Sequence, residues 1–172
     1  MTTHRAHTII INIVLLAWFM YPAFGQETAR RAISGRLIEV KVAAPALKGN
    51  LLGDPVEQSV AIYRPPSYDA SPSKRYPTLY LLHGFLGDSK AWSGVGRFSF
   101  NIPPLLDAMI GSNRIREMIV VAPSARNAYG GSFYSNSAVT GNWEDYIYRD
   151  LVGHVDANYR TLARPSSRGP KR

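Results

Sequence analysis

Apolar and polar residues are arranged along the first half of the chain in patterns that predict β-strands. Over residues 35–42 a more apolar side alternates with a wetter one, which is typical of a strand with one solvent-facing side. Residues 59–63 form a second short apolar run that ends at Arg64 and two prolines, and a turn-rich stretch at 48–55 separates the two runs. We therefore expect the domain to open with an antiparallel pair of strands.

Two longer apolar runs predict strands that are buried on both faces. Residues 76–82 are apolar nearly throughout and lead directly into His83 and Gly84, as expected of a central strand in a parallel sheet. Residues 117–122 form a similar run, which Pro123 is expected to stop. Both strands should lie in the middle of a sheet.

Helices are expected after each of these runs. Asn101 precedes two prolines that favour the first turn of a helix over residues 105–110, which Gly111 would end. Residues 143–158 show the four-residue spacing of an amphipathic helix, with acidic residues in its first turn; the apolar positions are Trp143, Ile147, Leu151 and Val155. The order of strands and helices predicts an α/β fold with a mostly parallel sheet and antiparallel opening strands.

The first 25 residues predict a secretory signal peptide. Arg5 precedes an apolar run over residues 9–20, and small residues at Ala23 and Gly25 suit cleavage before Gln26. A membrane anchor is the alternative, but Asn12 interrupts the run, which is shorter than the ~20 residues of a spanning helix. We expect a secreted or periplasmic protein with no stable membrane span after cleavage, and a domain over residues 26–163.

Charge and composition restrict the classes of partner and cofactor that the sequence predicts. The formal charge of +8 includes one arginine in the signal and five basic residues among the last thirteen positions, so the body of the chain is only about +2. No nucleic-acid partner is therefore expected, and residues 164–172 are predicted to be a disordered basic tail. The chain has no cysteine, and its histidines and carboxylates are not spaced as metal ligands, so neither a metal nor another cofactor is predicted.

Residues 81–88 carry the strongest chemical signal. The buried strand opens here into a loop with glycines at 84 and 87, which leave room for the backbone to approach a ligand. Ester hydrolysis places negative charge on the carbonyl oxygen, and rigid backbone N–H donors stabilise it. The loop therefore fits an oxyanion site.

Three segments, at residues 76–92, 118–123 and 142–160, resemble the esterase family of the α/β-hydrolase fold that includes esterase D (S-formylglutathione hydrolase), feruloyl esterases and mycolyltransferase antigens. The resemblance extends over most of residues 26–169. It implies a serine esterase acting on small-molecule esters, with the Phe85 amide as an oxyanion donor, Gly84 shaping the loop, and Trp92 and Trp143 near the acyl pocket. The alternative is that these aromatic residues pack in the core, which is the more common role of tryptophan.

The nucleophile expected of that family is missing from these residues. No serine in the chain has glycine two positions before and two after it, as the Gly-x-Ser-x-Gly elbow requires. The stretch that should lead into the elbow ends at Gly169, and the acid and histidine would follow the serine. His83 and His154 are not placed by chain order to be the base. We expect the N-terminal part of a hydrolase domain, truncated before the elbow and inactive as written, and a frameshift near codon 169 is one explanation.

Three alternatives remain open from the sequence. The chain could serve as a non-catalytic secreted binding module, or as part of an acyltransferase of the same family. Gly87, Asp88 and Ser89 also form a triplet that marks a different esterase family, although its position and the absence of a later Asp-x-x-His count against it. The glycine-rich residues 129–132 are expected to be a loop near the cleft.

Overall fold

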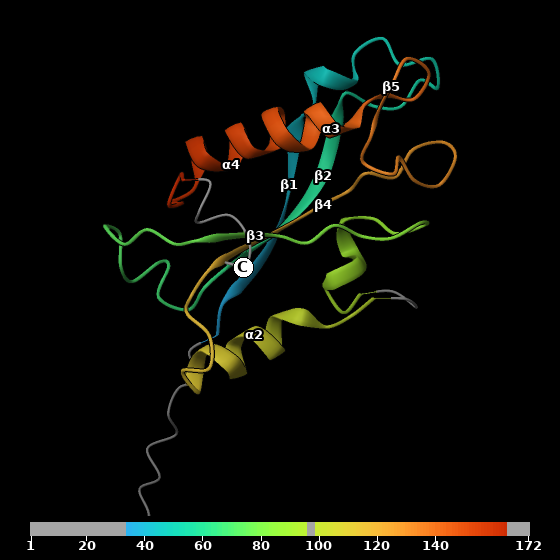
Figure 1. Cartoon of the computed structure of the whole chain (residues 1–172). Helices are drawn as coiled ribbons and strands as arrows, with labels where there is room; N and C mark the ends of the chain where they lie inside the picture. The colour runs from blue at the N-terminus through green and yellow to red at the C-terminus, as the bar shows by residue number, and fades with distance from the viewer. Residues whose placement is uncertain (1–33, 96–98, 165–172) are drawn as a thin grey trace, which may run out of the picture. The chain divides into compact units, whose positions relative to one another are not determined.

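A computed structural model describes residues 34–95 and 99–164 of the chain (Figure 1). Its main elements are β1 (Arg36–Ala43), β2 (Glu57–Arg64), β3 (Thr78–Tyr80), α2 (Ile102–Gly111), β4 (Ile119–Pro123), α3 (Trp143–Asp145), η3 (Tyr146–Leu151) and α4 (Val152–Asn158). Short elements lie between them: η1 (Pro45–Leu47), η2 (Ser89–Trp92), β5 (Asn136–Ser137) and β6 (Gly141–Asn142). The predicted signal peptide and residues 165–172 of the predicted tail lie outside the described residues.

The four longer strands form one mixed sheet in the order β1-β2-β4-β3. β1 and β2 are antiparallel, as the sequence predicts, with Arg36 opposite Arg64 and Ala43 opposite Glu57. β4 is antiparallel to β2 and parallel to β3. The expectation of a mostly parallel sheet is wrong for the described residues, because the opening pair supplies two of the four strands and only β3 and β4 run in the same direction.

β3 is shorter and more exposed than its apolar sequence predicts. It covers three residues at the edge of the four-stranded sheet, Leu79 and Tyr80 are half-buried, and Leu82 is 42% exposed. On the outer side of this segment, the pairing among the described residues is an isolated parallel bridge with residues that follow α4. In this bridge the Tyr76 amide donates to the Arg160 carbonyl at 2.8 Å. The prediction of a central strand buried on both faces is therefore wrong, because an apolar run does not specify how many strands flank it.

β4, by contrast, is buried along its whole length, as predicted, and Pro123 is its last residue. The side chains of β2 and β4 alternate between two separate cores. Ile62 and Val121 belong to the larger core, whereas Tyr63 and Val120 belong to the smaller one. Figure 1 shows α3 and α4 on one side of the sheet and α2 on the other. The period of two along each strand thus produces a helix–sheet–helix arrangement.

The helix predicted over residues 143–158 is confirmed, but its central segment η3 is a π-helix. Trp143, Leu151 and Val155 are fully buried, as the four-residue spacing predicts. Tyr146 is also fully buried, while Ile147 is only half-buried. A π-helical turn holds more residues than an α-helical one, so the buried face shifts by about one position here.

The shorter helix α2 begins three residues earlier than predicted, with both prolines in its first turn and Gly111 as its last residue. Asn101 precedes it, but the Asn101 side chain makes no capping hydrogen bond. Asp107 on this helix accepts hydrogen bonds from the Gly35 amide at 2.8 Å and the Tyr63 hydroxyl at 2.6 Å. These bonds join α2 to the start of β1 and to β2. In the part of the chain that the structure describes, no helix is long and apolar enough to cross a membrane.

Candidate active site

The candidate oxyanion loop, residues 83–87, leaves the sheet where β3 ends. β3 and β4 are parallel, so the residues that follow both strands meet at one edge of the sheet. Open α/β sheets bind their ligands beyond the carboxyl ends of the strands. The loop after β3 and the loop after β4, at residues 124–134, therefore form the candidate site together.

His83 joins these two loops through Nε2, and its Nδ1 makes a hydrogen bond within its own loop. The Ala125 amide donates to His83 Nε2 at 2.8 Å, so this nitrogen carries no proton. Nδ1 then carries the proton and donates to the Gly84 carbonyl at 2.7 Å. His83 is 5% exposed. His83 is thus a neutral structural residue whose only free lone pair is already used, and it does not serve as a general base in this arrangement.

The two glycines of the loop have different steric roles. A Cβ added to Gly87 would lie 2.9 Å from the His83 ring, so a side chain at this position would displace the histidine. A Cβ added to Gly84 would meet nothing within 4 Å. The Gly87 amide donates to the Gly84 carbonyl at 3.1 Å and closes the turn. The packing of His83 therefore requires a glycine at position 87, whereas the approach to a ligand expected at both glycines stays a prediction.

Phe85 presents both a free amide and an exposed ring. Among the described residues its N–H has no hydrogen-bond acceptor, whereas the next amide, that of Leu86, donates to the Gly130 carbonyl at 2.9 Å. Phe85 is 62% exposed, and its ring stacks on that of Phe133, with ring centroids 6.2 Å apart. Phe85 is therefore not a core residue. Its amide is available to a ligand, although its role as an oxyanion donor stays a prediction.

The loop after β4 supports the candidate oxyanion loop, and most of its contribution was not predicted. Asn127 is buried and its Oδ1 accepts from the amides of Tyr129 and Gly131, each at 3.0 Å. Gly130 has a φ of +93°, and a Cβ there would lie 2.8 Å from the Leu86 side chain. The paired glycines predicted a loop near the cleft, but no sequence signal pointed to Asn127.

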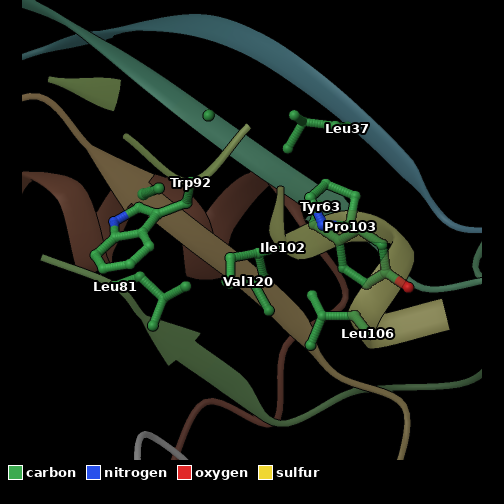
Figure 2. Close-up of a pocket in the computed structure, with 10 residues that line it drawn as sticks. Leu37, Tyr63, Leu81, Trp92, Ile102, Pro103, Leu106 and Val120 are labelled. Carbon is green, nitrogen blue, oxygen red and sulfur yellow. The ribbon is translucent and has the colours of Figure 1, made fainter. Parts of the chain in front are cut away.

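Of the two tryptophans proposed for the acyl pocket, Trp143 belongs to the larger core and Trp92 to neither of the two described cores. Trp143 is fully buried in the larger core, and its Nε1 donates to the Thr140 carbonyl at 2.7 Å. Trp92 follows the loop, stacks on Phe100 at 5.7 Å, and lines a narrow apolar cavity of about 10 Å³ between the sheet and α2 with Tyr63 and Leu81 (Figure 2). This space suits about one water molecule and not an acyl group. The structure does not bring the tryptophans together, so their substrate contacts stay a prediction that the packing does not favour.

Ser89, the serine of the alternative Gly-Asp-Ser triplet, is 2% exposed, and its hydroxyl donates to Glu39 at 3.1 Å. A buried serine bonded to a carboxylate does not have the access that a nucleophile needs. His154 lies half-buried on α4, where its carbonyl accepts from the Asn158 side chain. Within residues 34–95 and 99–164, no three His, Asp or Glu side chains gather as metal ligands.

Several solved esterase structures have a fold similar to that of this chain. A ferulic acid esterase matches with a TM-score of 0.66 and 19% identity over 79% of this chain and 48% of its own. A ferulic acid esterase from Anaeromyces mucronatus, solved in complex with ferulic acid, matches with a TM-score of 0.58 and 16% identity over 79% and 47%. An S-formylglutathione hydrolase from Agrobacterium tumefaciens matches with a TM-score of 0.53 and 15% identity over 75% and 46%.

At these identities the matches establish the fold, and the chain spans about half the length of each of these proteins. The sequence itself is more specific. A model of the family described as "Putative esterase" matches residues 55–168, which is more than half of the chain and includes both loops of the candidate site. The chain therefore belongs to this esterase family.

Proposed function

We propose that the chain supplies the oxyanion side of a secreted or periplasmic carboxylic-ester hydrolase that acts on small-molecule esters. One observation carries the proposal: at the carboxyl ends of β3 and β4, a tightly bonded loop leaves the Phe85 amide without an acceptor among the described residues. Membership of the esterase family and the esterase-like fold support it. The similar structure from Anaeromyces mucronatus was solved with ferulic acid, a carboxylic acid.

The chemistry requires more than this loop. When a nucleophile attacks an ester carbonyl, the oxygen gains negative charge, and each preorganised donor at that position contributes about 2.7–4 kcal/mol to the transition state. The nucleophilic serine, its histidine and the acid would come from a segment outside these 172 residues. A hydrolase transfers the acyl group to water and an acyltransferase to another alcohol, and the loop fits both reactions.

The proposal is tested first at the level of the gene. We expect the DNA beyond codon 169 to encode, in one of its three frames, a Gly-x-Ser-x-Gly motif followed by an acid and a histidine. The 172-residue chain should not turn over a p-nitrophenyl ester, and the chain extended through that segment should. Turnover by the 172 residues alone that survives Ser89→Ala would show that the nucleophile lies elsewhere in the chain.

The extended chain then tests the loop itself. Phe85→Pro removes the amide hydrogen, whereas Phe85→Ala keeps it and removes only the ring. We expect the proline variant to lose about 10²–10³-fold in kcat relative to the alanine variant. Equal kcat values for the two folded variants would remove Phe85 from the oxyanion site.

A second candidate function is a non-catalytic binding module. The stacked and exposed rings of Phe85 and Phe133, which are 62% and 79% exposed, favour it because they offer an apolar surface at the candidate site. This function predicts no Gly-x-Ser-x-Gly in any frame beyond codon 169, together with a cooperative thermal unfolding transition of the 172-residue chain. Aggregation of the purified chain, or a molten spectrum, would count against it.

A further inference from the structure

Tyr134 contacts the backbone of the candidate oxyanion loop directly. Its hydroxyl donates to the His83 carbonyl at 2.8 Å, and its ring lies against the His83 ring with centroids 5.8 Å apart. The accepting carbonyl belongs to the peptide bond between His83 and Gly84. Because a peptide bond is planar, this hydrogen bond restrains the His83–Gly84 peptide unit. The next unit carries the Phe85 N–H, and its Gly84 carbonyl bonds to His83 Nδ1 at 2.7 Å, so His83 links Tyr134 to that unit.

The same hydrogen bond completes a closed cycle between the two loops. The Ala125 amide donates to the His83 ring at 2.8 Å, and the Ala125 carbonyl accepts from the Ser132 amide at 3.0 Å. The Ser132 hydroxyl accepts from the Tyr134 amide at 3.2 Å. The Tyr134 hydroxyl then returns to the His83 carbonyl. His83 is therefore held at its ring by one end of the cycle and at its backbone by the other.

The backbone around Tyr134 is held in an unfavourable conformation. Phe133 and Tyr134 have φ values of +55° and +54°, in the left-handed region that residues with a Cβ rarely adopt. Two such residues in succession persist only where the surrounding contacts impose them. Burial raises the pKa of Tyr134 to about 12, so the phenol keeps its proton, and hence its role as donor, at neutral pH.

We propose that Tyr134 is a positioning residue of the candidate oxyanion loop: by closing the cycle through His83, Ala125 and Ser132, it fixes the direction of the Phe85 N–H. This inference rests on the proposed function for its catalytic meaning. The orientation of the loop by Tyr134 can be measured independently of any ester chemistry.

The chain offers a matched control in Tyr146. This tyrosine belongs to the same core, is fully buried, and has a hydroxyl with no hydrogen-bond partner among the described residues. Tyr134→Phe removes a hydroxyl that donates to the loop, while Tyr146→Phe removes one that does not. Both variants keep the aromatic ring, so both should fold.

The experiment compares amide hydrogen exchange and amide NMR spectra of the full 172-residue chain with those of the two variants. In Tyr134→Phe we expect exchange at the Leu86 amide to rise about tenfold, the order of one lost hydrogen bond, while exchange at Val121 in β4 stays unchanged. The Phe85 amide resonance should move in Tyr134→Phe and not in Tyr146→Phe. If Tyr134 had a merely structural role, its replacement would raise exchange at Leu86 and at Val121 together, and that result would overturn the inference. Equal effects of Tyr134→Phe and Tyr146→Phe would overturn it as well.

The proposed function is tested separately with methylphosphonate, a tetrahedral anion. Addition to the wild-type chain should shift the Phe85 amide resonance, and the shift should be smaller in Tyr134→Phe. No shift in the wild type, together with the expected exchange difference between the tyrosine variants, would reject the oxyanion role and leave the positioning of the loop by Tyr134 standing.

A second pair of variants keeps the inference falsifiable if Tyr134→Phe does not fold. Ser132→Ala removes the acceptor that holds the Tyr134 amide, and Ser135→Ala changes an exposed serine nearby. Faster exchange at Leu86 in Ser132→Ala alone is the expected result. Identical exchange in these two variants would contradict the closed cycle.

Discussion

The two ends of the parallel pair β3–β4 are built in different ways. At the carboxyl end, neutral hydrogen bonds among His83, Ala125 and Tyr134 hold a loop whose aromatic rings face solvent. At the amino end, Glu117 accepts from the Ser67 amide at 2.9 Å, from the Ser67 hydroxyl at 2.6 Å and from the Lys74 ammonium.

The two ends differ in what their hydrogen bonds support: stability at the amino end and the candidate binding loop at the carboxyl end. Near the amino end the hydrogen bonds satisfy a carboxylate that is mostly buried, and the Ser67 hydroxyl also contacts the Tyr76 hydroxyl at 2.9 Å. At the carboxyl end the backbone adopts left-handed φ values, and the Phe85 amide has no acceptor among the described residues. Strained backbone conformations concentrate at functional sites. We therefore expect substitutions at the amino end to change only stability, and those at the carboxyl end to change the loop as well.

The largest effect is expected from breaking the carboxyl end at His83. His83→Leu leaves the Ala125 amide without an acceptor and leaves the Gly84 carbonyl with the Gly87 amide as its remaining donor, so the free energy of unfolding should fall by about 2–4 kcal/mol. Urea denaturation followed by circular dichroism measures it. His83→Gln keeps an acceptor for the Ala125 amide and should lose less. Equal losses in the two variants would mean that packing, and not hydrogen bonding, sets the role of His83.

A pair of glycine variants sharpens the comparison within the loop. Gly87→Ala places a methyl group 2.9 Å from the His83 ring and should destabilise the chain by about 1–3 kcal/mol, as overpacking does. Gly84→Ala meets nothing within 4 Å and should change stability by less than about 0.5 kcal/mol. Thermal unfolding of both variants measures the difference. A larger loss of stability in Gly84→Ala than in Gly87→Ala would show that the steric constraint lies at Gly84 and not at Gly87.

A smaller loss than at His83 is expected at the amino end. Burial alone would raise the pKa of Glu117, but hydrogen bonds from Lys74 and Ser67 outweigh it and hold the pKa below its ordinary value. The hydrogen bond to Glu117 in turn raises the pKa of Lys74. Glu117→Gln should therefore cost about 1–2 kcal/mol at neutral pH and leave the Phe85 amide resonance unmoved.

The pH dependence of that loss has a defined sign. The contribution of Glu117 is present above its unfolded pKa near 4.5 and is lost as the pH falls through its lower folded value. The contribution of Lys74 is present below its unfolded pKa near 10.5 and is lost as the pH rises through its higher folded value. The difference in Tm between wild type and Glu117→Gln should shrink at both extremes. A difference that is constant with pH would contradict the ion pair.

Much of the fold could be predicted because it depends on local patterns. The alternation over residues 35–42 gives β1, and the spacing of Trp143, Leu151 and Val155 gives the last helix. The burial of Tyr146 in place of Ile147 could not be predicted, because the π-helical segment depends on how the helix packs on the sheet. The edge position of β3 was missed for a similar reason, since its sequence does not state which strands lie beside it.

The sequence predicted the loop of the candidate site but not the residues that hold this loop in place. Gly84, Phe85 and Gly87 identified the loop, because glycines that follow an apolar strand are a local signal. The resemblance implied that Trp92 and Trp143 lie near one acyl pocket, yet Trp143 packs in the larger core and Trp92 lines a small cavity beside the smaller one. Tyr134 and Asn127 gave no signal, since a tyrosine or an asparagine in a polar loop has no distinctive pattern.

The sequence by itself determined the order of strands and helices, the loop after β3 and membership of the esterase family, because each of these is encoded in neighbouring residues or in the spacing of short motifs. Only the tertiary structure decided which face each side chain occupies and how the loop is held. The bonds from Ala125 and Tyr134 to His83 join residues 42 and 51 positions apart. Such contacts form only when the sheet brings the two loops together, and no local pattern records them.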